Sequence, residues 1–507
     1  MLASYCSLLY ELLLAHTMGL LFGDTVIQYS LTIGIYLFSL GIGSFLTDRL
    51  KHVRRSLFWV EIALSIIGSL AAIVLLFNQD FILLSKLFGM GLPLWIVNAI
   101  FYLPVLIIGI LSGMEIPLFY RIAEGSSDLS RVLAYDYFGS LVAAVLFPLV
   151  LLPAFGMVSV GIITGLLNLA IALCLLYKSN LRKILYVVVA FVGLVLVCLL
   201  IQSENIELEI SQKFVAGIFR TEYAIFEDEI ELIDIKQTPY QSFYFGSRDS
   251  SYNGSPITSY FLILDKEFQM ESAYEKNYHE PYVHPLFCLV NVSDVLIIGG
   301  GDGMLTREIL KYDSVERVDH IDIDSFVTDY FTHDEIGRML NNDSFWDPRV
   351  NLVNTDGISF MRENDKEYDV IFFDLPSPIY EAIARFHSVE VYTIVLNNLN
   401  DEGFFITHTA QNHAPYQASS MKEAGFAYIQ EYKIDIWQRY LLGANFDFDY
   451  KDYSENNNCE GKSVVYSDEL HRTVLNGSYD LPFEMDDSYL NSIYKPNIRF
   501  FRESYGG

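Results

Sequence analysis

A glycine-rich loop that carries one carboxylate is the segment of this sequence whose residues point most directly to chemistry. Gly299–Gly301 and Gly303 surround Asp302, directly after an apolar run. Glycine lets the backbone turn sharply and approach a ligand closely. The loop is not a full GxGxxG, because Met304 takes the last place. A carboxylate here would repel a pyrophosphate and attract a sulfonium or an amine. The loop therefore favours an adenosyl-sulfonium cofactor over NAD.

Further acids follow at the ends of predicted strands. Asp322 lies about 20 residues beyond the loop, where an acid usually holds ribose hydroxyls, and Asp324 competes for that role. Asp356, before a glycine, can accept a hydrogen bond from an adenine amino group. Asp374 can accept a proton from an amine that attacks the carbon next to sulfur, help worth roughly 10²–10⁴ in rate. A single such acid is as often a cap or turn residue, but four in this order weaken that alternative.

The elements that must position these acids alternate between strands and helices. A helix is expected over Met304–Tyr312, and strands are expected over Asp294–Ile298, Val318–Ile323, Val350–Val353, Tyr368–Phe373 and Gly403–Thr407. This alternation predicts a parallel, doubly wound, Rossmann-like domain of the class I methyltransferase type. Ligands of such sheets bind at the carboxyl ends of the strands, where the acids lie. Strands expected within Val215–Ile235 and over Tyr260–Leu264 predict a small β subdomain before it.

The first 202 residues have a different composition. They hold 10 Lys and Arg against 9 Asp and Glu, whereas the rest of the chain holds 23 against 53. A membrane span needs roughly 20 apolar residues. Seven stretches qualify, which predicts an α-helical transmembrane bundle with spans at Leu2–Phe22, Val26–Leu46, Leu57–Phe77, Leu94–Met114, Leu133–Pro153, Met157–Tyr177 and Ile184–Ile201.

The domain boundaries follow from this contrast. We predict a multi-span domain over residues 1–202, a linker with the small β-rich subdomain over 203–290, and the catalytic domain over 291–507. The acidic second half disfavours nucleic acid as a partner and suits solubility or a cationic substrate. No cysteine or histidine spacing indicates a metal site.

The loop charges address orientation. Basic residues occur at Arg49–Arg55, from Arg121 to Arg131, and at Lys178–Lys183, all on one side of a seven-span arrangement. The positive-inside rule makes that side cytoplasmic and places the soluble half outside. A cytosolic cofactor demands the opposite, and a re-entrant or additional segment at Phe81–Leu92 would change the count. We expect a multi-pass protein of the cell membrane with a cytoplasmic catalytic domain, although the loop charges argue the other way.

Four acids lie in or near the expected spans: Glu11, Glu61, Glu115 and Asp136. Intramembrane carboxylates are costly and usually face a cavity or a partner. They indicate either a polar pathway or small-molecule site, or structural pairing at helix ends.

The ordered motifs of the second half resemble the spermidine synthase (polyamine aminopropyltransferase) family, and the resemblance covers roughly 239–407. It is strongest at GGGDGMLTRE, Gly299 to Glu308, and it includes Thr238-Pro239-Tyr240-Gln241, Gln269, Tyr278-His279-Glu280, Asp322-Ile323-Asp324, Asp356-Gly357 and Tyr368-Asp369-Val370-Ile371 leading to Asp374. The first half resembles the multi-span extension of some bacterial members, at Tyr10-Glu11 and Glu115-Ile116-Pro117 among other places.

The resemblance implies that decarboxylated S-adenosylmethionine is a co-substrate, with no permanently bound cofactor, and that methylthioadenosine is released. A polyamine or another small amine such as putrescine would be the acceptor, the lipid bilayer a further partner, and a homodimer is implied by the resemblance alone. Asp374 would be the base, and Tyr278, Asp302 and Ser377 would contact the amine groups. The implied cofactor contacts are Gln241, Gln269, His279, Gly299, Gly301, Asp302, Gly303, Asp322 and Asp356.

The acceptor site departs from the family pattern. Soluble members usually carry Asp-Ser-Ser-Asp-Pro after the strand, whereas this chain carries Asp374-Leu375-Pro376-Ser377-Pro378. In the family the second acid of that motif helps to hold the acceptor, and here it is Ser377. Tyr274 replaces another acid. These changes put putrescine in doubt as the acceptor.

Two alternatives to membrane-bound aminopropyl transfer stay open at this point. One is a methyltransferase that uses intact S-adenosylmethionine, because fold alone cannot exclude it. The other is a non-catalytic sensor of polyamines or nucleosides, or a transporter-linked protein.

Overall fold

The structure, a computed structural model, describes residues 1–22, 25–77, 99–122, 129–177, 184–222, 230–252, 254–376, 378, 381–410, 412–433, 438–448, 462–463 and 489–493. The segment Phe81–Leu92 lies outside the described residues. The chain forms two compact units, Met1–Asp249 with Leu262–Lys266, and Ser250–Phe261 with Glu267–Gly507. The three-part division at 202 and 290 stays a prediction.

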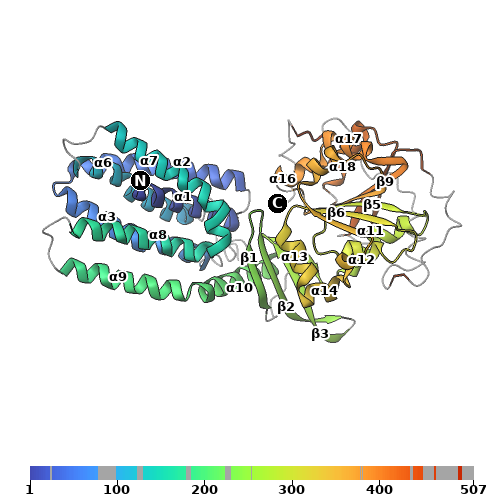
Figure 1. The fold of residues 1–507 in the computed structure, drawn as a ribbon, viewed down its shortest axis with the longest axis horizontal. Coiled ribbons are helices and arrows are strands. Elements are labelled where there is room, and N and C mark those ends of the chain that lie inside the picture. Colours follow the sequence, from blue (N-terminus) through green and yellow to red (C-terminus); the bar gives the residue numbers. More distant parts are fainter. Residues whose placement is uncertain are drawn as a thin grey trace, which may run out of the picture. The chain divides into compact units, whose positions relative to one another are not determined.

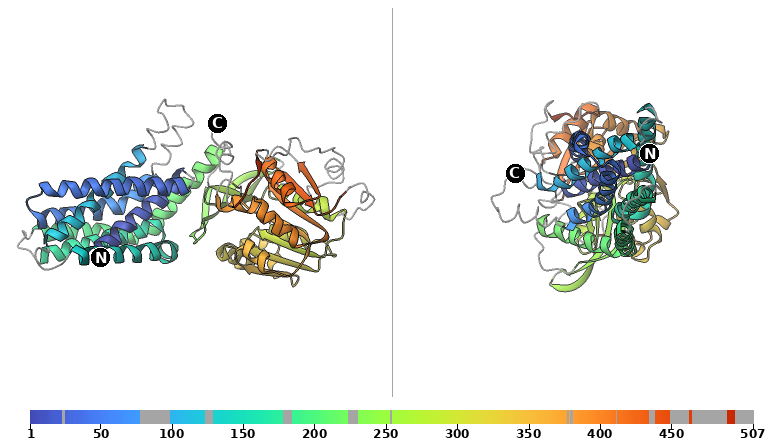
Figure 2. Two further views of the ribbon diagram at one scale, coloured as in Figure 1. Left: turned by 90° about the horizontal axis from the view of Figure 1, so that it is seen from above. Right: turned by 90° about the vertical axis from the view of Figure 1, so that its left-hand side faces the viewer.

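The first unit consists mainly of long apolar helices that run side by side (Figures 1 and 2). A 3₁₀ turn at Thr47–Arg49 follows α2, and a π-helical turn at Phe147–Leu151 joins α7 to α8. The described helices are α1 Leu2–Phe22, α2 Thr25–Leu46, α3 Val53–Phe77, α6 Leu103–Ile122, α7 Leu129–Leu146, α8 Leu152–Tyr177, α9 Ile184–Ile201 and α10 Ser203–Glu222.

Within the described residues, six helices are long and apolar enough to cross a membrane: Leu2–Phe22, Ile27–Arg49, Val53–Phe77, Ala99–Ile122, Ser130–Tyr177 and Ile184–Ile201. The fifth is 48 residues long and contains two of the predicted spans. Its backbone leaves helical geometry at Gly156, with φ +71° and ψ 171°. The predicted count of seven spans therefore stays a prediction.

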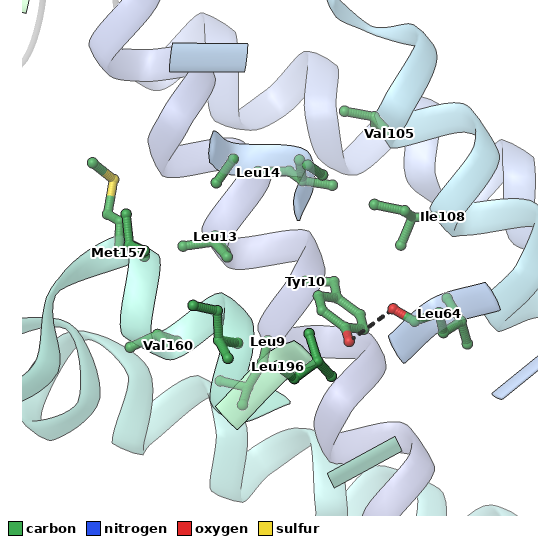
Figure 3. Packing of buried hydrophobic residues seen from close by; sticks show 14 of the residues in the cluster. Leu9, Tyr10, Leu13, Leu14, Leu64, Val105, Ile108, Met157, Val160 and Leu196 are labelled. Atoms are coloured by element: carbon green, nitrogen blue, oxygen red, sulfur yellow. Dashed lines mark hydrogen bonds between the residues drawn. The ribbon is translucent and has the colours of Figure 1, made fainter. Parts of the chain in front are cut away.

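Glycines and buried side chains hold the helices of this unit together. A Cβ on Gly113 of α6 would lie 2.2 Å from the Leu40 carbonyl oxygen of α2, so these backbones touch. Small residues permit such close approach between apolar helices. Tyr10 of α1 donates its hydroxyl to the Leu64 carbonyl of α3 at 3.1 Å. Figure 3 shows this bond among apolar side chains of α1, α3, α6, α8 and α9.

The helix α10 extends the first unit beyond the last apolar helix. Its Ile210, Phe214 and Ile218 are buried at intervals of four residues, which is the period of one helical face. The expectation of strands from Val215 was therefore wrong up to Glu222, and β1 begins at Ile230. Apolar residues at helical spacing outweighed the β-branched residues there.

Glu207 of α10 caps the break in α8. The Met157 N–H donates to Glu207 Oε1 at 3.2 Å, just after Gly156. Burial raises the pKa of the Glu207 carboxyl to about 7, against the two backbone N–H groups that lower it. The contact joins α10 to the broken helix within one unit.

A small sheet follows α10. Its order is β1-β2-β3-β4, and β1 pairs with β2 in antiparallel fashion. The expected strand at Tyr260–Leu264 lies in β3. The bounds are β1 Ile230–Gln237, β2 Ser242–Tyr252, β3 Ser255–Leu264 and β4 Glu267–Glu271.

The second unit contains a seven-stranded sheet of order β10-β11-β9-β8-β5-β6-β7. Strands β5 to β9 are parallel to one another, while β11 is antiparallel to both β9 and β10. The predicted Rossmann-like sheet is thus confirmed. The strands are β5 Asp294–Gly299, β6 Arg317–Asp322, β7 Val350–Asn354, β8 Tyr368–Asp374, β9 Leu399–Thr409, β10 Tyr428–Lys433 and β11 Arg439–Ala444.

Helices cover both faces of this sheet (Figure 1). On β5, Val295 and Ile297 pack in one cluster with α11 and α12, whereas Leu296 and Ile298 pack in the other with α15, α17 and α18. This alternation follows from the two-residue repeat of a strand. The helix predicted over Met304–Tyr312 ends at Ile309. The helices are α11 Lys276–Phe287, α12 Met304–Ile309, α13 Ser325–His333, α14 Glu335–Asn341, α15 Gly357–Glu363, α16 Glu381–Ala384, α17 Val389–Asn397 and α18 Ala414–Ala424, with 3₁₀ turns at Ser344–Trp346 and Arg385–His387.

Candidate active site

The glycine loop connects β5 to α12 at the carboxyl edge of the sheet. Gly299, Gly300 and Gly303 have φ of +87°, +67° and +75°, values that favour glycine. A Cβ on Gly300 would lie 2.7 Å from Asp374 Oδ2, and a Cβ on Gly301 would lie 2.8 Å from Asp322 Oδ2. The loop therefore needs glycine where it runs against two of the predicted site acids.

Asp302 is buried at the turn of this loop. Its Oδ1 accepts a hydrogen bond from the Met304 N–H at 2.8 Å, which leaves the rest of the carboxyl group for a ligand. Burial raises the pKa of Asp302 to about 6, and nearby His279 opposes that rise. Burial, together with the neighbouring acids Asp324 and Asp302, raises the pKa of half-buried Asp322 to about 7. A cation bound here would lower both pKa values and bind strongly.

Asp374 lies beside the loop because β8 and β5 are adjacent parallel strands in register, with Gly299 opposite Asp374. Its Oδ1 accepts a hydrogen bond from the Tyr278 hydroxyl at 2.8 Å. Burial raises the pKa of Asp374, while His279 and the Tyr278 hydroxyl lower it. A carboxylate oriented by a phenol in this way can accept a proton.

His279 contacts Glu275, which forms a buried ion pair with Arg307. It also interacts electrostatically with Asp302 and Asp374. Its Nδ1 lies 2.9 Å from Glu275 Oε2, which also accepts from Arg307 Nη2 at 2.7 Å. Burial alone would lower the pKa of His279, but Glu275, Asp302 and Asp374 raise it overall. A protonated imidazole here would stabilise the ionised forms of Asp302 and Asp374.

Asp356 and Asp324 are both helix caps, with different freedom to bind a ligand. Asp356 Oδ1 accepts from the N–H and the hydroxyl of Ser359, each at 2.9 Å, and its Oδ2 pairs with Arg385 at 2.8 Å. Asp324 is buried and accepts from the Phe326 N–H at 3.1 Å. The cap role explains Asp324, so Asp322 is the better placed of the two competing acids.

Three predicted site residues lie apart from this description. Gln269 is on β4 and donates to the Glu267 carbonyl at 3.2 Å. Gln241 belongs to the first unit, where its N–H donates to the Thr238 hydroxyl at 3.1 Å. Ser377 lies outside the described residues.

Sequence reasoning gave no role to several aromatic side chains that surround Tyr278. Its ring packs on the rings of Tyr282, His408 and Tyr440 with centroids 5.5, 5.2 and 6.0 Å apart. The Tyr440 hydroxyl donates to the Tyr278 carbonyl at 2.7 Å. Residues of β9 and β11 come from a distant part of the sequence, and no local pattern marked them.

A cavity lies next to the loop that follows Asp374. Its lining comes from that loop and from the end of β9: Leu375, Pro376, Pro378, His387, Thr407, His408, Thr409, Ala410 and His413. Burial lowers the pKa of His387 to about 3 and that of His413 to about 4, so both imidazoles are neutral at pH 7. These two side chains add no positive charge to the cavity.

Comparison with known proteins agrees with this geometry. The model of the spermine/spermidine synthase domain matches residues 275–433. A polyamine aminopropyltransferase of Leptospira interrogans serogroup Icterohaemorrhagiae serovar copenhageni is 32% identical over 404 residues, which is 78% of this chain and 75% of that protein. The chain belongs to the spermine/spermidine synthase family. As a member of that family it is an aminopropyl-transferring transferase in polyamine biosynthesis.

Other members extend the similarity beyond the catalytic unit. Polyamine aminopropyltransferase 2 of Ralstonia nicotianae is 33% identical over 448 residues, 83% of this chain and 80% of that protein. Only 305 of the 507 residues follow Gln202, so an alignment of 448 residues must include part of residues 1–202. A solved spermidine synthase in complex with the transition-state analogue AdoDATO is 24% identical and has a TM-score of 0.39, over 48% of this chain and 84% of that one.

Proposed function

We propose that this family member is a membrane-bound enzyme that transfers the aminopropyl group of decarboxylated S-adenosylmethionine to an amine and releases methylthioadenosine. The observation that carries the proposal is the meeting of Asp302 and Asp374 at the glycine loop, next to Tyr278.

The charges of the site suit the decarboxylated cofactor. This molecule carries a sulfonium and an ammonium group and no carboxylate. Asp302 would face its ammonium group, with His279 near the same tail. Intact S-adenosylmethionine would bring a carboxylate toward buried Asp302 and Asp374, where like charges repel. The acids therefore favour aminopropyl transfer over methyl transfer.

The remaining contacts would orient the nucleoside. The loop backbone at Gly299, Gly301 and Gly303 would approach the ligand, and Asp322 would accept hydrogen bonds from the ribose. Asp356 would accept from the adenine amino group through an oxygen it now shares with Arg385 or Ser359. Gln269 would flank the cofactor, and the same role for Gln241 stays a prediction from the family resemblance.

The transfer itself is a displacement at carbon. The nitrogen of a neutral amine attacks the methylene carbon next to sulfur, a carbon–nitrogen bond forms, and the carbon–sulfur bond breaks. The bond electrons return to sulfur, which gives the neutral thioether methylthioadenosine. Asp374 takes the proton that the new ammonium loses, and the Tyr278 hydroxyl holds that carboxylate in place.

The acceptor nitrogen would lie beside Asp374, the residue that takes its proton. Neutral His387 and His413, which line the small cavity next to the loop after Asp374, do not repel a cationic diamine. We propose a small amine as acceptor, with putrescine as one candidate of a diamine panel.

The apolar helices support attachment to the cell membrane, and a soluble cytosolic co-substrate supports a catalytic unit on the cytoplasmic side. Periplasmic or extracellular labelling of a cysteine placed at exposed Asp365 would contradict this orientation. Protection in intact cells, with labelling after lysis, is the expected result.

Calorimetric binding of decarboxylated and intact S-adenosylmethionine to the purified full chain tests the chemistry. We expect preference for the decarboxylated form and release of methylthioadenosine with at least one amine of the panel. Preference for the intact form would overturn the proposal in favour of methyl transfer, and release with none of the amines would overturn it as well.

A further inference from the structure

Two buried carboxyl groups belong to the first unit, called the helical unit below, and have no role in the proposed aminopropyl transfer. Glu61 on α3 is 0% exposed and Glu115 on α6 is 3% exposed. Helices α3 and α6 pack against each other, and the two carboxyl groups lie close enough to interact electrostatically. Yet both oxygens of Glu61 and Oε1 of Glu115 have no donor among the described residues. Two carboxylates offer only acceptors, so a proton or a cation must lie between them.

Two further polar side chains of the same region lack partners among the described residues. The hydroxyl of Ser65 and both amide atoms of Asn168 are fully buried and make no hydrogen bond there. Ser65 lies one turn after Glu61 on α3 and so shares its face of the helix. Buried polar groups in native proteins are nearly always hydrogen-bonded. Among the described residues, these buried atoms thus have hydrogen-bonding capacity left for a ligand.

The way α3 and α8 pack places Asn168 of α8 at the height of Glu61 and Ser65 along α3. A Cβ on Gly161 would lie 3.2 Å from the Ser69 carbonyl oxygen, and a Cβ on Gly165 would lie 2.6 Å from the Ser65 carbonyl oxygen. The two helices are therefore antiparallel, and each turn of α8 lies beside one turn of α3. Asn168, the next residue on this face of α8, is level with the turn between Glu61 and Ser65.

The other acid close to Glu115 is already paired. Asp136 of α7 accepts a hydrogen bond from the Ser4 hydroxyl of α1. Structural pairing thus explains Asp136, whereas it does not explain Glu61 and Glu115.

We propose that Glu61, Glu115, Ser65 and Asn168 form a binding site for a primary alkylammonium ion inside the helical unit. Such a group has three N–H donors and no acceptor, which matches a nest of carboxylate, hydroxyl and amide oxygens. Its charge also compensates carboxylates that are buried away from water. The choice of an organic ammonium over a metal ion rests on the proposed function, which makes amines the substrates of this chain.

The test uses the full chain in lipid nanodiscs, with Asp302→Asn and Asp374→Asn present to weaken amine binding at the catalytic site. Equilibrium binding of radiolabelled putrescine should show about one saturable site per chain. Adding Glu61→Gln and Glu115→Gln should weaken that binding about 10–100-fold, because charge-assisted hydrogen bonds are lost. The matched control is Glu204→Gln, the same change at an exposed position of α10, which should leave binding unchanged.

Three results would overturn the proposal: no saturable putrescine binding in the nanodisc sample, binding that the paired Gln changes leave intact, or sodium or proton uptake at the pair without amine binding. Failure of the proposed function is seen separately, as absence of methylthioadenosine release from the chain with native Asp302 and Asp374. In that native background, Glu61→Gln should leave the rate of aminopropyl transfer at saturating amine unchanged.

Discussion

Buried carboxyl groups are treated differently in the two units. In the catalytic unit Asp302 accepts from a backbone N–H, Asp374 from a phenol, and Glu308 from Arg307, with Lys311 as a further partner. In the helical unit Glu61 and Glu115 meet each other with no donor among the described residues. The first arrangement fixes each acid before a substrate arrives. The second is complete only when something positively charged or a proton is added.

This contrast has an energetic meaning. Removing an acid from a satisfied buried network leaves its cationic partners unpaired, which is costly. Removing charge from an unsatisfied pair relieves desolvation and repulsion instead. Neutralising Glu308 should therefore destabilise the fold, whereas neutralising Glu61 should not. The predictions below contrast the two units in rate, stability and affinity.

The largest effect is expected at the catalytic base. Asp374→Asn keeps the shape of the side chain but cannot take the proton of the attacking amine. The turnover rate should fall by roughly 10²–10⁴, while calorimetric affinity for decarboxylated S-adenosylmethionine changes much less. Asp365→Asn, at an exposed position before β8, is the control. A near-native rate for Asp374→Asn would remove this residue from the role of base.

The next effect is on folding. Glu308 is fully buried and its pKa is held at about 2 by His284, Arg307 and Lys311, against the cost of burial. Glu308→Gln should lower the free energy of unfolding by about 3–5 kcal/mol, since Arg307 and Lys311 lose the negative charge of their buried partner. Exposed Glu316→Gln should change it little.

The pH dependence of this stability has a definite sign. Because the folded pKa of Glu308 lies below its ordinary 4.5, its contribution is present above about pH 4.5 and is lost as the pH falls toward about 2. The native chain should therefore lose more stability than Glu308→Gln over that window in chemical denaturation. Parallel pH curves for the two proteins would argue against the network.

A smaller effect is expected on cofactor affinity. Asp302 has a pKa of about 6, and a bound ammonium group favours its ionised form. Affinity for the decarboxylated cofactor should fall by up to tenfold per unit as the pH drops below about 6. Asp302→Asn should remove this step and weaken binding at pH 8 by about tenfold or more. Calorimetry from pH 5 to 8 measures this pH dependence of affinity. If the affinity of Asp302→Asn depends on pH as the native affinity does, the titrating group is Asp322 instead.

The smallest effect should come from the helical unit. Glu61→Gln allows the amide to donate to Glu115, so without amine the thermal stability of the nanodisc sample should stay within about 0.5 kcal/mol of the native value or rise. A loss as large as that of Glu308→Gln would erase the contrast between the units.

The second unit could be predicted from sequence in most of its essentials. The run from Asp294 to Ile298 is apolar and short and ends in glycines, so both its strand and its place at a ligand edge follow from local chemistry. Asp374 was placed beside the loop because parallel strands share one carboxyl edge. The register that sets Gly299 opposite Asp374 then came from the structure.

Other features depend on contacts between distant residues. His408 and Tyr440 approach Tyr278 only after β9 and β11 join the sheet, and neither lies in a motif. Val215 was expected in a strand because its neighbourhood alternates, but burial at four-residue spacing made it helical. The sequence identified Glu61 and Glu115 as costly acids, but the fact that they face each other required the packing of α3 and α6.

The contact between Glu207 and the broken helix α8 affects how the chain can be divided experimentally. A cut at 202, where the composition changes, would separate Glu207 from the Met157 N–H that it caps. The helical part would then be left with an uncapped helix start at Gly156, and the catalytic part would carry a detached amphipathic helix. A truncation placed between Glu222 and Ile230 would keep α10 and its Glu207 cap with α3, α8 and α9, although it would separate α10 from β1, on which it also packs.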